Sequence, residues 1–97
     1  MKQLTVFCSR DLEKQVLSTL DKAEVRGFLR VGDATGHKFM PEGEVPRSLT
    51  WEAVMLIVPG AEDRVIDGVV AELRLLAQDC EIEPCLRLLV TTDCEVY

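Results

Sequence analysis

The chain has 97 residues, of which 47% are hydrophobic, and a formal net charge of −6. This size predicts one globular domain over residues 1–97, at the small end where oligomerisation often adds stability. The negative charge argues against nucleic acid or anionic lipid as the main partner, because both require a basic face. No apolar run reaches the length of a membrane span. The first residues lack the pattern of a secretory signal, so we expect a cytoplasmic protein.

The first half of the chain predicts a strand, a helix and a second strand. Residues 4–8 form an apolar, strand-like run, and residues 28–31 form another. Between them, apolar residues recur at the spacing of one helical face: Leu12, Val16, Leu20 and Ala23. Gly32 and Gly36 then indicate either a loosening strand end or a bulge.

The second half repeats this order after a long polar loop over residues 37–50. Residues 51–58 are almost continuously apolar, which predicts an interior strand with helices on one face and a subunit partner on the other. A second helical face follows, made of Val65, Ile66, Val69, Leu73, Leu76 and Ala77. Gly68 lies within this helix at a cost of about 1 kcal/mol relative to alanine, so we expect close packing there. Residues 86–90 predict the last strand.

The order of these elements is β-α-β-loop-β-α-β, which predicts an α+β, ferredoxin-like double split βαβ domain. Such a domain has an antiparallel sheet with strand order 4-1-3-2 and two helices on one face. This topology should bring Cys8, the 37–50 loop and the 80–85 segment to one end of the sheet, with Cys94 toward the other end. Long loops in compact domains are often functional.

The pair Cys80 and Cys85 has three possible roles. The two thiols could form a redox-active disulfide, bind Zn²⁺ or Cu⁺ together with Cys8 or His37, or simply be buried. A heavy-metal tolerance protein therefore remains an alternative function. His37 is the only histidine, and no catalytic constellation or nucleotide motif is present, so we do not expect an enzyme.

Four residues in or beside the loop have open roles. His37 could be a ligand, a phosphate contact or an ordinary exposed side chain. Phe39 and Met40 could dock a partner protein or pack onto their own domain. Trp51 begins a strand, where a place in the core or at a subunit interface is more usual than a stacking platform.

Residues 25–31, the glycines Gly32 and Gly36, the long loop, the strand at 51–58 and the helix from residue 61 together resemble the PII superfamily. The resemblance implies a homotrimer whose long loop contacts a membrane transporter or an enzyme. It also implies a small effector, an adenine nucleotide or a bicarbonate-type ligand, bound in clefts between subunits. The implied cleft residues are Gly36, His37, Lys38 and Arg87.

The 80–85 segment is acidic, whereas nitrogen-regulatory PII proteins carry glycines and basic phosphate contacts there. The chain is therefore more similar to PII-like relatives than to classical sensors of ATP and 2-oxoglutarate. The divalent-cation-tolerance family, which shares the architecture, is a near alternative.

Overall fold

The computed structural model describes residues 1–39, 48–78 and 85–97. Four strands form one sheet: β1 (Lys2–Ser9), β2 (Leu29–Phe39), β3 (Ser48–Ala61) and β4 (Leu86–Thr91). A short 3₁₀ turn, η1 (Arg10–Leu12), leads into α1 (Glu13–Lys22), and α2 (Asp63–Ala77) follows β3. Neither described helix is both long enough and apolar enough to span a membrane.

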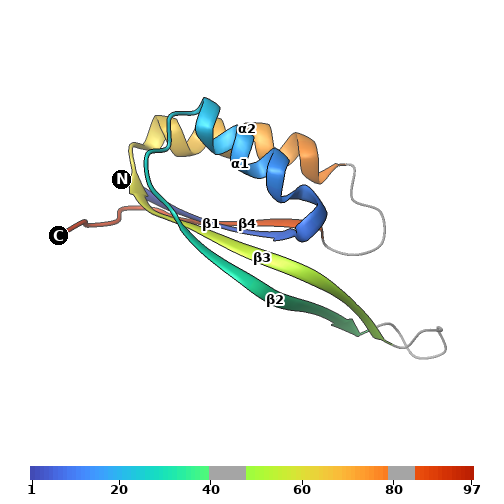
Figure 1. Cartoon of the computed structure of the whole chain (residues 1–97). Helices are drawn as coiled ribbons and strands as arrows, with labels where there is room; N and C mark the ends of the chain where they lie inside the picture. The colour runs from blue at the N-terminus through green and yellow to red at the C-terminus, as the bar shows by residue number, and fades with distance from the viewer. Residues whose placement is uncertain (40–47, 79–84) are drawn as a thin grey trace.

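The sheet order is β2-β3-β1-β4, and every neighbouring pair is antiparallel. Both helices cover the same face of this sheet (Figure 1). The arrangement is the predicted ferredoxin-like double split βαβ fold, with the predicted strand order. The opposite side of the sheet is hereafter called the helix-free face.

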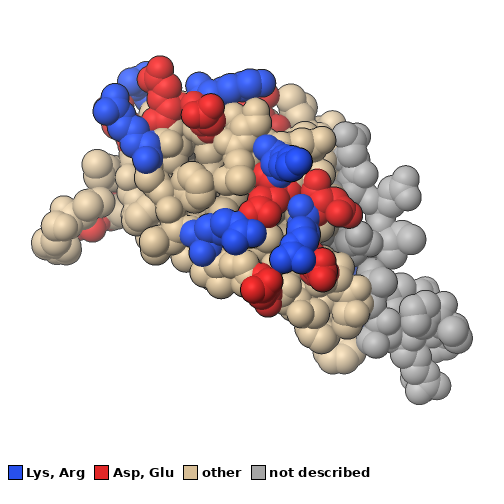
Figure 2. Space-filling model, in the orientation of Figure 1, with Lys and Arg blue, Asp and Glu red and all other residues tan. Residues whose placement is uncertain are grey.

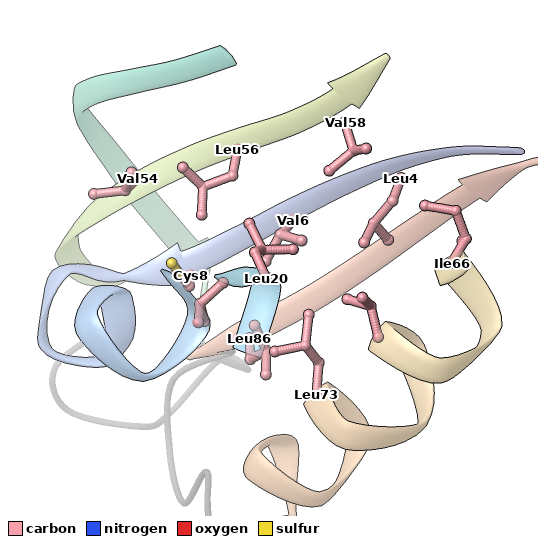
Figure 3. Packing of buried hydrophobic residues seen from close by; sticks show 12 residues of the cluster. Leu4, Val6, Cys8, Leu20, Val54, Leu56, Val58, Ile66, Leu73 and Leu86 are labelled. Atoms are coloured by element: carbon pink, nitrogen blue, oxygen red, sulfur yellow. The ribbon is translucent and has the colours of Figure 1, made fainter. Parts of the chain in front are cut away.

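The core lies between the sheet and the two helices (Figure 3). Alternate residues of β1 and β3 point toward the helices because side chains alternate across a strand. The helices contribute the residues that their apolar periodicity predicts. The buried cluster consists of Leu4, Val6, Cys8, Val16, Leu20, Val54, Leu56, Val58, Ile66, Val69, Leu73 and Leu86.

The strands β2 and β3 extend beyond the rest of the sheet as a two-stranded arm (Figure 1). The last pairing of β1 with β3 joins Ser9 to Ala53, whereas β2 and β3 stay paired out to Phe39 and Ser48. The predicted loop at 37–50 is therefore wrong at both ends, where strand pairing continues. Residues 40–47 lie outside the described residues.

A bulge allows β2 to continue past its glycines. The register with β3 shifts between Val31 and Ala34, and Asp33 adopts a left-handed φ of 56°. Of the two possibilities that the sequence left open at Gly32, the bulge is confirmed and the loosening strand end is wrong. The one extra residue on β2 is absorbed locally, so the ladder resumes and forms the arm.

Gly68 does not pack closely, contrary to the expectation from the sequence. Apart from the backbone of its own helix, a methyl group added there would meet no atom of the described residues within 4 Å. The residue borders an open groove that it shares with Thr19, Lys22 and Glu72. Its cost to the helix is therefore not offset by a close approach between backbones.

Candidate effector site

A hollow of about 640 Å³ lies on the helix-free face, where the arm leaves the sheet. All four strands contribute to it, because the register aligns Val31, Met55, Phe7 and Arg87 across the sheet. Residues directly opposite each other in antiparallel strands share a face. The wall of the hollow is mostly apolar, and Arg87 and His37 add a guanidinium and an imidazole.

Three of the four predicted ligand-binding residues line this one hollow: Gly36, His37 and Arg87. Their roles in binding stay predictions. Lys38 is exposed on β2 and is not among the lining residues. Of the two predicted docking residues, Phe39 is 87% exposed at the end of β2, and Met40 lies outside the described residues.

Trp51 and Gly36 are in close contact across the arm. They are register partners in β3 and β2. A Cβ atom built on Gly36 would lie only 2.2 Å from Cε2 of the indole and 2.6 Å from Nε1. The indole thus occupies the space that a side chain at residue 36 would need, and it forms part of the wall of the hollow.

Arg87 is available to a negatively charged ligand. Its Nη1 donates a hydrogen bond to the Leu86 carbonyl oxygen at 3.4 Å. Within residues 1–39, 48–78 and 85–97, no carboxylate forms an ion pair with it. Of the residues that the structure describes, no acidic one lines the hollow.

Two other described arginines near the arm, Arg10 and Arg30, are already paired. Arg10 bridges β2 and β3, because its guanidinium lies 3.2 Å from the Asp33 carboxylate of β2 and 3.1 Å from the Glu52 carboxylate of β3. Arg30 pairs with Glu13 of α1, and this hydrogen bond holds the pKa of the Glu13 carboxyl below its ordinary value. The face seen in Figure 2 accordingly carries basic and acidic side chains side by side.

The cysteines occupy different environments. Cys8 is 2% exposed, and burial, with a smaller contribution from Glu13, raises the pKa of its thiol to about 11. So little thiolate at neutral pH suits a packing residue better than a metal ligand or a redox group. Cys85 is disulfide-bonded, whereas Cys8 and Cys94 are free. Cys80 lies outside the described residues.

The positions of the three described cysteines, Cys8, Cys85 and Cys94, agree with the topological expectation. The Ser9 N–H at the end of β1 donates to the Cys85 carbonyl oxygen at 2.8 Å. At the other end of β1, the Cys94 N–H donates to the Met1 carbonyl oxygen at 3.0 Å. In the part of the chain that the structure describes, no three His, Cys, Asp or Glu side chains are grouped to hold a metal ion.

Sequence reasoning missed several residues of the hollow, notably Phe7, Trp51 and Met55. Side chains alternate between the two faces of a sheet along each strand, and each of these three residues occupies a position that points to the helix-free face. This signal was present in the alternation of the strands. Their shared position, however, depends on how β1 and β3 are aligned, which the sequence alone does not show.

No protein-family model and no curated protein sequence matches the chain. Solved structures do resemble it. CPII from Thiomonas intermedia K12, a nitrogen regulatory PII-like protein bound to ADP, AMP and bicarbonate, is 16% identical with a TM-score of 0.71; the match covers 93% of this chain and 86% of that one. Apo CPII is 17% identical, with a TM-score of 0.69 over 93% and 85% of the two chains.

The GlnK–ATP complex of B. subtilis is a more distant match. It is 12% identical with a TM-score of 0.66, over 93% of this chain and 78% of that one. All of these likenesses extend over most of both chains. The chain therefore has the fold seen in these PII-like structures.

Proposed function

We propose that the chain is a PII-like regulatory protein that forms a trimer and binds a small effector in clefts between subunits. The effector is an adenine nucleotide or a bicarbonate-type anion, and the output is a contact between the 37–50 segment and a membrane transporter or an enzyme. The protein acts in the cytoplasm and has no catalytic activity of its own. The observation that carries the proposal is the hollow at the base of the arm, which brings Gly36, His37 and Arg87 together.

The helix-free face supports the trimer. Its apolar side chains include Leu29, Val31 and Leu89, which are 61%, 44% and 60% exposed. With Phe7 and Met55 they form neighbouring rows across the sheet. A contiguous apolar surface of this kind is typical of an interaction site. Copies of the chain that meet on this face would also enclose the hollow.

A matched pair of leucines tests the trimer by light scattering. Leu89→Asp puts a charge on the helix-free face and should yield monomers. Leu75→Asp is the control, because Leu75 is similarly exposed, at 58%, but lies on α2. If wild type is a monomer at every concentration, or if both variants remain trimeric, the proposed assembly is wrong.

Calorimetry with AMP, ADP, ATP and bicarbonate tests the effector. Arg87→Gln removes the arginine that lines the hollow among the described residues and should weaken binding by about 10- to 100-fold, as expected for a lost hydrogen bond to a charged group. Arg74→Gln, on the exposed part of α2, is the control and should bind as wild type does. Binding by neither the nucleotides nor bicarbonate would refute the effector proposal.

Hydrogen exchange tests whether effector binding changes the arm. A regulatory ligand must bind two states of the arm with different affinities. Exchange at residues 34–39 and 48–53 should therefore slow when a saturating effector is present. Unchanged exchange throughout the arm would show that ligand binding is not transmitted to it.

A further inference from the structure

Trp51 lies where a ligand in the hollow could reach it. The β1 strand ends at its pairing with Ala53, so Trp51 is beyond the three-stranded part of the sheet. It is only partly buried, and its indole borders the same hollow that Arg87 and His37 line. A core tryptophan would be enclosed by the packed cluster between sheet and helices, but Trp51 is not a member of that cluster.

The glycine opposite Trp51 fixes how the indole lies. Because atoms of both indole rings would approach a Cβ at Gly36 to within 2.6 Å, the ring system rests against the backbone of β2. Glycine at residue 36 thus lets the indole rest on the arm. An aromatic ring supported on one side by backbone offers a flat surface to a planar ligand.

The chemistry around the indole matches one class of molecule. The wall combines an aromatic surface, other apolar side chains and one guanidinium without a carboxylate partner among the described residues. A nucleotide has a planar base, which stacks on aromatic side chains, and an anionic phosphate, which binds arginine. A bicarbonate ion would use the guanidinium alone.

We propose that Trp51 is an effector-binding residue that stacks against the base of an adenine nucleotide whose phosphate meets Arg87. This inference rests on the proposed effector site and names the part of the ligand that each side chain recognises. Gly36 is then a positioning residue, because it permits the indole to lie in its binding orientation.

The test compares AMP with adenosine in calorimetry on the full chain. Trp51→Leu should weaken both ligands by about 5- to 100-fold, the usual effect of losing a stacking platform. Trp51→Phe should restore most of the affinity. Arg87→Gln should weaken AMP but not adenosine, because adenosine has no phosphate. Light scattering checks that each variant keeps the assembly of wild type.

The outcomes separate this inference from the proposed function. If wild type binds AMP and Trp51→Leu binds it equally well, the role of Trp51 is overturned while the effector site stands. If wild type binds no adenine compound, the adenine-nucleotide proposal itself fails.

A second measurement covers the case in which Trp51→Leu does not fold. Trp51 is the only tryptophan, so its fluorescence in wild type reports on the hollow directly. Saturating AMP should quench or shift this emission. An unchanged spectrum at saturation, established by calorimetry, would overturn the stacking contact.

Discussion

Alanine substitutions at Gly36 and Gly68 should change the free energy of unfolding in opposite directions. Gly68 lies inside α2, and its added methyl would meet nothing within 4 Å. The substitution should therefore stabilise the protein by about 0.4–1 kcal/mol, because alanine restricts the unfolded chain and favours helix. At about 4–8 °C per kcal/mol for a domain of this size, the melting temperature should rise by several degrees.

The same methyl at Gly36 has no space. Three atoms of the Trp51 indole would lie 2.2, 2.4 and 2.6 Å from it, so the ring must move or the strands must separate. Overpacking of this kind costs about 1–3 kcal/mol. We expect Gly36→Ala to lower the melting temperature and to weaken AMP binding.

Thermal unfolding followed by far-ultraviolet circular dichroism measures both effects. All proteins must be compared at one concentration, because association makes the melting temperature concentration-dependent. Combining Gly36→Ala with Trp51→Leu completes a double-mutant cycle, and the two changes should compensate in part because the smaller side chain removes the clash. A neutral Gly36→Ala would refute the contact with Trp51. A destabilising Gly68→Ala would show that the groove beside Gly68 is filled.

Three further predictions concern charge, cysteine chemistry and the core. The hydrogen bond from Arg30 lowers the pKa of Glu13 in the folded protein. The stabilisation by this hydrogen bond is therefore present above the ordinary glutamate pKa of about 4.3 and is lost as pH falls through the lower folded pKa. In urea titrations over that pH range, Glu13→Gln should lose less stability than wild type. Iodoacetamide at pH 8 should modify Cys94 before Cys8, because the Cys8 thiol is buried with a pKa of about 11; equal rates by mass spectrometry would contradict this environment. Leu56→Ala, at a fully buried site, should cost about 2–5 kcal/mol in the same titrations, and a loss below 1 kcal/mol would mean that the core repacks.

Much of the fold was predictable because its signals are local. The helical faces of α1 and α2 repeat with the helical period, and the loop lengths restrict the order of the strands. The apolar run at 51–58 indicated an interior strand, which β3 is. These features depend on residues close together in the chain, where periodicity and side-chain chemistry suffice.

The arm and the site depend on pairing between distant residues. Gly32 and Gly36 are typical of a strand end, yet β2 continues because β3 offers a partner ladder on the far side of the bulge. Whether Gly36 faces Trp51 or a smaller residue depends on the register, which a shift of one residue would change completely. The open space at Gly68 similarly depends on where α1 lies, not on the sequence of α2.

The arm consists of two strands, and within the described parts of the chain no third strand lies beside its outer half. A ribbon of this kind is only marginally stable alone, so residues 35–39 and 48–52 can open without loss of the central sheet. The ion pairs of Arg10 with Asp33 and Glu52 hold the inner end of this ribbon to the turn after β1. The protein therefore has a cooperative unit of low local stability next to a rigid body. A partner that binds the outer strands needs to supply only the free energy of ordering that unit. The equilibrium between the paired and the open arm is therefore easy to shift in either direction.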